Sequence, residues 1–231
     1  DAGNHCVVAF HAANGTVAWT IGGGDDGQLN FPQAVFVQPG GTAGLLVVVD
    51  THAANVEDRE DNSPDPLRRI WRWSGSRVPF QAHRLQWFDL VTQTHVRTVD
   101  RWGGGALPCC FPGGCMTGCG DIVVLALGDR DSGPRGGYES GEPLVQVLDP
   151  TGEFVRASFG DYGEGDDELL SPVSLAWSEH TGHLLIADSA GRRVKVWTVG
   201  GEWIRSFGAG RLHEPCSVAV DGTGQGFVGD R

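Results

Sequence analysis

The sequence predicts an all-β fold built from repeated four-stranded antiparallel units, and three observations lead to this prediction. Short apolar runs alternate with polar residues along the chain, which is the pattern of half-buried strands. Glycine supplies 36 of the 231 residues, more than twice the average share of about 7%, and the glycines fall between the runs as turns. One order of features recurs along the chain: a proline, an apolar run, a turn, a second apolar run and an aspartate.

The repeated half-unit has a nearly constant length. It begins at one of four prolines and ends at an aspartate that lies 18, 17, 16 and 15 residues further on, in chain order. The prolines are Pro32, Pro112, Pro172 and Pro215, and the aspartates are Asp50, Asp129, Asp188 and Asp230. Each half-unit holds two apolar runs with a turn between them, which predicts two strands, named a and b here.

A second half follows Asp50, Asp129 and Asp188, and one more copy of it follows Asp1 at the start of the chain. It also holds two alternating runs, which predict strands c and d. A glycine marks the c–d turn in three copies (Gly15, Gly152 and Gly200), and Asn14 before Gly15 predicts a type I′ hairpin. The copy after Asp50 turns at "VTQTH" instead. Four-stranded antiparallel units of about 40–45 residues indicate the blades of a β-propeller.

Two segments carry a more specific resemblance. "DAGNHCVVAF" and "IADSAGRRVKVWTVGGEWIRSFGAGRLHEPCSVAVD" resemble NHL repeats, whose pattern runs approximately D-x-G-N-x-R-V-x-V-F, G, F, G and then P-x-x-V-A-V-D. The match extends over residues 1–37 and 143–231 and is weak across 51–120. The resemblance implies one NHL-type β-propeller domain over residues 1–231, with four recognisable blades and a loop insertion at about 51–84. It also implies a segment of the six-bladed ring that this family usually forms. The Gly-His and Trp-Asp punctuation of a WD-type propeller does not occur in the sequence.

The two ends of the chain cut through the repeat. The chain begins with a predicted strand c and finishes with a predicted strand b. In one interpretation the two ends complete a single blade, because closing the ring removes exposed sheet edges. In the other, both ends continue into a longer chain. The sequence leaves both interpretations open.

Most of the long segments between predicted strands belong to one face. In antiparallel order the b–c and d–a connections share one face, and the short a–b and c–d turns share the other. The long b–c segments are "THAANVEDREDNSPDPLRRIWRWSGSRVPFQAH" and "RDSGPRGGYESGE", and "GDYGEGDDELL" is a d–a connection. Because long loops on a rigid scaffold commonly carry binding sites, we expect the function on this face, named the connection face below.

One basic and aromatic segment lies within the first b–c insertion of this acidic protein. Its candidate binding residues are Arg68, Arg69, Trp71, Arg72 and Trp73. Guanidinium and indole groups together suit an anionic or aromatic partner and are frequent at protein interfaces. In the alternative, the Trp rings pack against a neighbouring blade and the arginines pair with nearby acids. On the residues alone, this structural alternative is the simpler of the two.

Two groups of residues are candidates for metal binding. Four thiols in eleven residues would suit Zn²⁺, but their spacing lacks the C-x2-C of most structural zinc sites, and a disulfide or free thiols are the alternatives. These candidate ligands are Cys109, Cys110, Cys115 and Cys119. The acidic loops "GGGDDGQ" and "GDYGEGDDE" offer oxygen atoms to Ca²⁺ without the spacing of a known calcium loop, so solvated loops are the simpler expectation. The repeated aspartates are expected to accept backbone N–H groups where strands end.

The sequence favours recognition over catalysis. Its eight histidines are scattered, and no H-E-x-x-H, G-x-S-x-G or P-loop pattern occurs. Some proteins of the NHL type are enzymes, the peptidyl-hydroxyglycine amidating lyases. Their histidine ligands cannot be matched here, where His52, His83 and His213 fall in connection-face segments. We therefore expect a non-catalytic scaffold that binds a protein or peptide. A metal-dependent lyase or lactonase-like hydrolase is the alternative, and RNA binding comes third.

Composition limits the partners. The net charge of −12 and the sequence pI near 4.9 disfavour binding to nucleic acid or an anionic membrane, because phosphate contacts need basic groups. No apolar run approaches the ~20 residues of a membrane span, and no signal-peptide pattern is found, so the sequence assigns no compartment. Neighbouring domains of a longer chain are expected as further partners.

Overall fold

The computed structural model describes residues 4–22, 29, 32–38, 44–53, 81–99, 113–125 and 144–231, and their regular structure consists of β-strands. The first four-stranded sheet contains β3 (Pro32–Gln38), β4 (Leu45–Ala53), β5 (Gln81–Asp89) and β6 (His95–Val99). The second contains β7 (Gly114–Met116), β8 (Ile122–Leu125), β9 (Val145–Leu148) and β10 (Val155–Phe159). The third contains β13 (Pro172–Ser178), β14 (His183–Asp188), β15 (Arg193–Thr198) and β16 (Trp203–Phe207). Within each sheet the strands pair in chain order and antiparallel, as the sequence predicts for a, b, c and d.

Two antiparallel hairpins stand at the ends of this series, and a short parallel pair joins the second and third sheets. The hairpins are β1 (Cys6–Phe10) with β2 (Val17–Gly22), and β17 (Pro215–Val220) with β18 (Gly226–Asp230). The parallel pair is β11 (Asp161–Tyr162) with β12 (Glu168–Leu169). By their order in the repeat, β1 and β2 are a c–d hairpin, whereas β17 and β18 are an a–b hairpin. The described fold is therefore all-β, with mostly antiparallel four-stranded sheets, and is consistent with a propeller-like fold.

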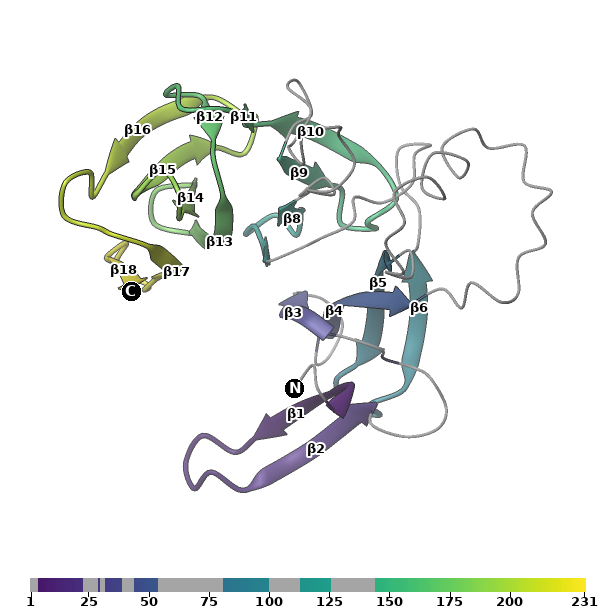
Figure 1. Cartoon of the computed structure of the whole chain (residues 1–231). Helices are drawn as coiled ribbons and strands as arrows, with labels where there is room; N and C mark the ends of the chain where they lie inside the picture. Colours follow the sequence, from purple (N-terminus) through teal and green to yellow (C-terminus); the bar gives the residue numbers. More distant parts are fainter. Residues whose placement is uncertain are drawn as a thin grey trace, which may run out of the picture.

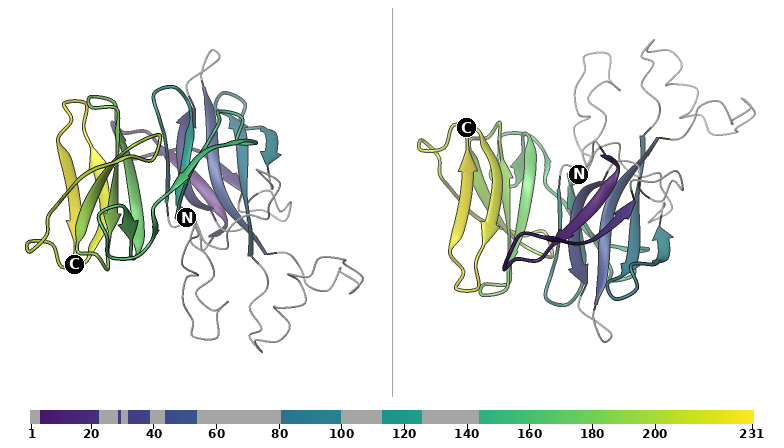
Figure 2. Two further views of the ribbon diagram at one scale, coloured as in Figure 1. Left: turned by 90° about the horizontal axis from the view of Figure 1, so that it is seen from above. Right: turned by 90° about the horizontal axis from the view of Figure 1, so that it is seen from below.

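The sheets follow one another around an open arc (Figure 1). The a strands lie innermost, since β3 contacts β7, β7 contacts β13, and β13 contacts β17. Seen from above and below, the strands of each sheet run between two faces of the arc (Figure 2). The two end hairpins remain separate two-stranded sheets with a gap between them (Figure 1). In this structure the two end hairpins therefore do not pair into one blade.

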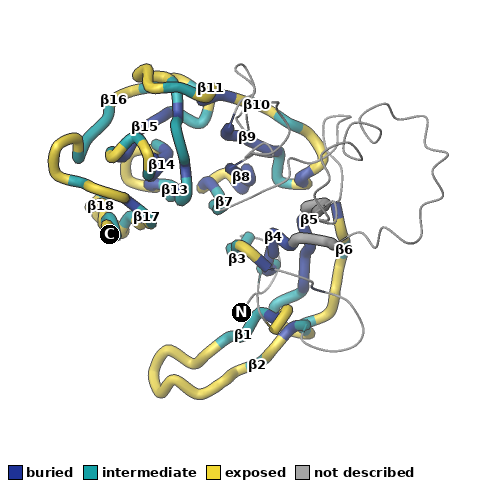
Figure 3. The backbone as a smooth tube through the Cα atoms, viewed as in Figure 1, coloured by how far each residue is buried: buried dark blue, intermediate teal, exposed yellow. Residues whose placement is uncertain are grey.

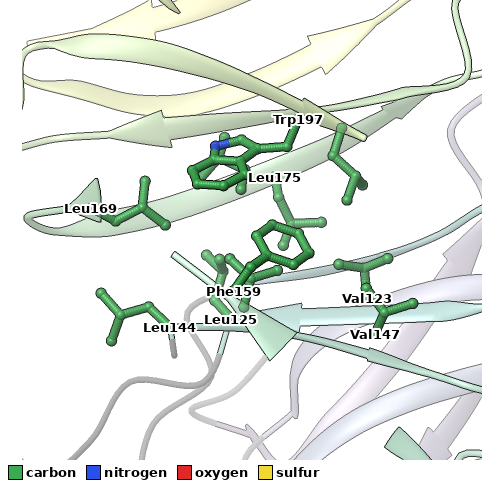
Figure 4. Packing of buried hydrophobic residues seen from close by; sticks show 11 residues of the cluster. Val123, Leu125, Leu144, Val147, Phe159, Leu169, Leu175 and Trp197 are labelled. Atoms are coloured by element: carbon green, nitrogen blue, oxygen red, sulfur yellow. The ribbon is translucent and has the colours of Figure 1, made fainter. Parts of the chain in front are cut away.

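The core consists of layers between successive sheets. One cluster joins the first and second sheets around Trp87, and another joins the second and third around Trp197, which stacks on Phe159 with ring centroids 5.0 Å apart (Figure 4). Strands β8 and β9 are buried along almost their whole length because sheets cover both of their faces (Figure 3). Burying each aliphatic side chain in such a layer contributes about 1.5–3 kcal/mol. Sheet-on-sheet packing is thus the main source of stability.

In three repeats the end of strand b pairs with the start of strand a, whereas Pro112 and Asp129 of the remaining repeat lie outside the described residues. The register pairs Pro32 with Asp50, Pro172 with Asp188 and Pro215 with Asp230, and each pair is followed by the same irregularity in the ladder. Proline is tolerated at this position because it starts the strand and lies beside the irregularity. The constant spacing found in the sequence therefore reflects a repeated pairing of strands a and b.

A glycine–leucine contact recurs where strand d ends. Gly22, Gly160 and Gly208 have φ values of +81°, +77° and +89°. A Cβ at each would lie against a leucine of the following d–a connection, namely Leu29, Leu169 and Leu212 respectively. Glycine is needed at these positions both for the left-handed backbone and for the room that the leucine occupies. The contact fixes where each d–a connection turns inward.

The c–d turns differ from the sequence prediction in two details. Gly15 has a φ of +70° but Asn14 does not have a positive φ, so the type I′ prediction was wrong, since that turn requires positive φ at both central residues. Instead the Asn14 side chain accepts hydrogen bonds from the backbone N and Oγ1 of Thr16 at 3.0 and 2.8 Å. In the last complete sheet the left-handed residue is Gly201 rather than Gly200.

The first sheet departs from the prediction at both the turn and the insertion. In the "VTQTH" turn, Gln93 takes the left-handed conformation with a φ of +57°, and its amide donates to the carbonyl of Val91 at 2.7 Å. The pairing of β4 with β5 continues through Thr51–Ala53 and Gln81–His83, which the sequence assigned to the loop insertion. The alternation of that segment is too weak for the sequence to mark these strand ends.

Candidate functional site: the connection face

Three described connections define the connection face. Residues 160–171 and 208–214 are d–a connections, and residues 189–192 are a b–c turn. Two of them are joined directly, because the N–H of Ser189 donates to the carbonyl of Ser171 at 2.9 Å. The a–b and c–d turns lie at the other ends of the strands and are short. The two described d–a connections thus lie at the opposite strand ends from the described a–b and c–d turns, whereas the long b–c segments lie outside the described residues, so the separation of long and short connections stays a prediction.

The connection at 161–169 is a compact loop whose ends lie side by side. Strands β11 and β12 pair in parallel, with Asp161 opposite Glu168 and Tyr162 opposite Leu169. Within the loop, the N–H of Gly165 donates to the carboxylate of Glu168 at 2.8 Å. Compact surface loops with adjacent ends are frequently functional. Its exposed carboxylates belong to Asp161, Glu164, Asp166 and Asp167.

Two basic side chains of β15 bind the backbone of this loop. The Nζ of Lys195 donates to the carbonyls of Gly165 at 2.6 Å and Asp166 at 3.1 Å, and also to the carbonyl of Glu168. The Nη2 of Arg193 donates to the carbonyls of Glu164 at 2.8 Å and Gly165 at 3.2 Å. Inward-facing backbone carbonyls need partners because an unpaired buried carbonyl is costly. The two side chains supply these partners.

Lys195 is the only lysine in the chain, and its side chain is fully buried. Burial lowers its pKa to about 8, and the neighbouring Arg193 lowers it further, while Asp188 and the acids of the loop oppose this effect. At pH 7 the group is still mainly an ammonium with three N–H donors. The three loop carbonyls match this number of donors.

Asp188 confirms the expected structural role of the repeated aspartates. Its Oδ1 accepts hydrogen bonds from the backbone N–H groups of Leu170 at 3.1 Å and Ser171 at 2.8 Å, the two residues before strand a. Its Oδ2 and the Nε of Arg193 are buried without a hydrogen-bond partner among the described residues. The carboxylate thus fixes the end of the d–a connection rather than facing a channel.

The same position is used differently in the other described repeats. Asp230 accepts hydrogen bonds from the backbone N–H groups of His213 at 3.0 Å and Glu214 at 2.7 Å, and these bonds, with His213 first, lower its pKa. Asp50 instead accepts from the Arg84 guanidinium at 2.8 and 3.0 Å and from the Gln86 amide at 2.9 Å. All three aspartates therefore stabilise strand ends. Asp1 and Asp129 lie outside the described residues.

The predicted binding residues are not among those the structure describes. Arg68, Arg69, Trp71, Arg72 and Trp73 all lie outside the described ranges, so their role stays a prediction. The three histidines of the connection-face segments belong to two different sheets. His52 and His83 belong to the paired ends of β4 and β5, and His213 precedes β17.

The cysteine cluster is described only in part. Cys109 and Cys110 lie outside the described residues. Cys115 packs against the core between the second and third sheets, and burial raises the pKa of its thiol, which favours the protonated form over a zinc-binding thiolate. Cys119 is exposed, and its Sγ lies 3.7 Å from the Oγ1 of Thr117. Among the described residues no three His, Cys, Asp or Glu side chains gather as metal ligands. Cys6 is buried.

Sequence reasoning missed the anchoring of the 161–169 loop. It assigned the acidic segment to solvent and did not connect it with β15. The available signal was compositional: sixteen of the seventeen basic residues are arginines, and the one lysine stands inside a strand whose neighbours are apolar. An isolated lysine within an apolar run indicates a buried ammonium with specific acceptors.

Comparisons with known proteins give a distant likeness to NHL-repeat proteins and a clearer one in fold. No family model matches the chain. The chain is 31% identical over 85 residues to Protein brain tumor of Drosophila melanogaster, an NHL-repeat protein. The matched residues make up 36% of this chain and 8% of the relative.

Within the described residues, no helix has both the length and the apolar character needed to cross a membrane.

Two solved structures share the fold at low sequence identity. Hydrazine synthase of Kuenenia stuttgartiensis is similar with a TM-score of 0.62 and 11% identity, over 98% of this chain and 65% of that chain. A functionally unknown protein from Desulfotomaculum acetoxidans DSM 771 is similar with a TM-score of 0.56 and 12% identity, over 98% and 56%. The chain thus spans less than two thirds of the length of each of these proteins. At these identities, the likeness extends to the arrangement of β-sheets.

Proposed function

We propose that the protein is a non-catalytic scaffold of the NHL β-propeller type that binds a protein or peptide on its connection face. The observation that carries this proposal is the rigid support of that face. Asp188, Arg193 and Lys195 hold the backbone of the 160–171 connection against the third sheet, and Asp230 binds the backbone at the end of the 208–214 connection. A surface held in one conformation loses less entropy when a partner binds.

The chemistry of the face supports recognition of a polar partner. The acidic loop presents several exposed carboxylates, while Arg192 and Arg211 are exposed on the neighbouring connections. Charges of both signs at the rim of an interface contribute to specificity and association rate. The segment from Arg68 to Trp73 belongs in sequence to the b–c connection between β4 and β5, and the proposal includes it as the source of aromatic anchors.

Three ionisable groups that support the described connections are engaged with the backbone. Asp188 and Asp230 accept backbone N–H groups, and Lys195 donates to backbone carbonyls. A general acid, base or nucleophile must instead reach a substrate in a cleft. This use of the three charges favours a scaffold over the lyase or hydrolase alternative.

Selection of binding peptides with the purified chain, followed by charge reversal on each face, tests the proposal. On the connection face we choose Asp166→Arg and Arg211→Glu, whose side chains are exposed. The matched controls, Glu153→Arg and Glu202→Arg, lie in exposed c–d turns on the opposite face. We expect the selected peptides to lose at least tenfold in affinity with the first pair and less than twofold with the controls. The reverse order, or no peptide binding below millimolar concentration, would contradict the proposal.

A further inference from the structure

We propose that the amino group of Lys195 is the latch of a lid: the 161–169 loop closes over the third sheet through this side chain and opens, without unfolding of the sheet, when the latch is absent. Compact surface loops of this size are usually packed by their own side chains. Here the middle of the loop depends on a side chain from a different element. The proposal goes beyond the recognition function, since it concerns how one part of the connection face is ordered.

The contacts divide the loop into fixed ends and a latched middle. At the beginning, Gly160 lies against Leu169, and at the end Asp188 binds the N–H groups of Leu170 and Ser171. Neither contact involves Lys195. Between these points, Lys195 reaches three carbonyls of residues 165–168, and Arg193 reaches two of residues 164–165. Removing the amino group therefore leaves the ends in place and removes acceptor partners only from the middle.

Charged groups of both signs act on the ammonium of Lys195 in the closed loop. Arg193 on the same strand repels the ammonium, whereas Asp188 on β14 and the loop's Asp166 and Asp167 attract it. Closing the loop removes the ammonium from water, which costs free energy unless all three donors find acceptors. The Oδ2 of Asp188 remains without a hydrogen-bond partner among the described residues. Removing the three donors of the ammonium leaves the loop carbonyls without these partners, and this loss favours opening.

The first sheet provides an internal comparison. Asp50 pairs with Arg84 in the register as Asp188 pairs with Arg193, and Gln86 is the counterpart of Lys195 two residues further along strand c. The Gln86 amide donates to the Asp50 carboxylate of its own sheet. The equivalent position of the first sheet thus carries a polar side chain that binds the strand-b aspartate. This makes Gln86 the matched control position.

Cleavage by a glutamate-specific protease measures opening of the lid. Glu164 and Glu168 lie in the loop, and Glu153, Glu179 and Glu202 lie in turns of the opposite face as internal references. In Lys195→Met, which keeps the length of the side chain without its donors, we expect cleavage in the loop to be at least tenfold faster than in the wild type. The reference sites should change by less than twofold, and Gln86→Met should leave the loop sites unchanged. Unchanged loop cleavage in Lys195→Met would overturn the proposal.

A measurement on the wild-type chain keeps the test independent of whether the variant folds. Because the protein has one lysine, labelling with ¹⁵N-lysine gives one side-chain ammonium signal. A latched ammonium exchanges its protons with water slowly, and we expect its signal to be visible at pH 6 and 25 °C with correlations to the loop. Exchange as fast as that of free lysine would show that the side chain is not covered, and would overturn the proposal. In the protease experiment, equally faster cleavage of Lys195→Met at the loop and reference sites would also count against the proposal, since opening would then be global.

Discussion

Replacement of Asp188 by alanine removes the carboxylate that connects β14 to the start of β13. Two backbone N–H groups, of Leu170 and Ser171, lose their acceptor at 3.1 and 2.8 Å in a partly buried site. An unsatisfied buried donor costs about 1–3 kcal/mol, and loss of the unpartnered Oδ2 offsets part of this cost. We therefore expect Asp188→Ala to reduce the free energy of unfolding by about 2–4 kcal/mol. Asp188→Asn keeps an acceptor oxygen and should cost clearly less.

Urea unfolding followed by tryptophan fluorescence measures this effect. With a denaturant slope of about 2–3 kcal/mol/M, the expected loss lowers the midpoint by roughly 1 M. Asp221→Ala is the control, because Asp221 makes similar turn bonds to Thr223 and Gln225 but is exposed, so water replaces the lost acceptor. A midpoint shift for Asp188→Ala no larger than that of the control would refute the reasoning. Burial of the hydrogen bonds from Leu170 and Ser171 to Asp188 would then contribute nothing to stability.

Three further predictions follow from the described residues. In Gly160→Ala the new Cβ would lie only 2.8 Å from Leu169 on a backbone with a φ of +77°, so we expect the free energy of unfolding in the same urea assay to fall by about 2 kcal/mol or more. Gly182→Ala, at a φ of +67° with no atom within 4 Å of the new Cβ, should lower it less. The stability of the wild type relative to Lys195→Met should rise between pH 8 and 10.5, because the folded state releases the lysine proton near pH 8 while the unfolded chain retains it; a flat difference would exclude a lowered pKa. The raised pKa of Cys115 predicts that Cys115→Ser purifies with the same zinc content as the wild type, and metal analysis showing that the variant alone loses zinc would restore Cys115 as a ligand.

The repeat and its strand order could be predicted from the sequence because both depend on local signals. Proline, aspartate and the period-two runs mark the ends and faces of each strand, and antiparallel order then follows from short turns. The structural role of the aspartates was also predictable, since a residue that recurs in every unit serves the unit. These inferences need no knowledge of distant contacts.

The remainder depends on contacts between residues far apart in the chain. The anchoring of the acidic loop joins Gly165 with Lys195, thirty residues away. The left-handed conformation of Gln93 depends on a hydrogen bond of its own side chain, for which no propensity rule exists. Whether the end hairpins meet depends on the curvature of the whole arc, to which every layer of the core contributes. Such properties are set by packing rather than by local pattern.

A hydrogen-exchange footprint of a selected peptide bound to the purified chain tests the central claim most directly. If the connection face is the recognition surface, amides in residues 161–171, 189–192 and 208–214 will exchange more slowly in the complex. The c–d turns at residues 11–16, 89–94, 149–154 and 198–202 will keep their rates. Slower exchange confined to those c–d turns would place recognition on the opposite face and contradict the account.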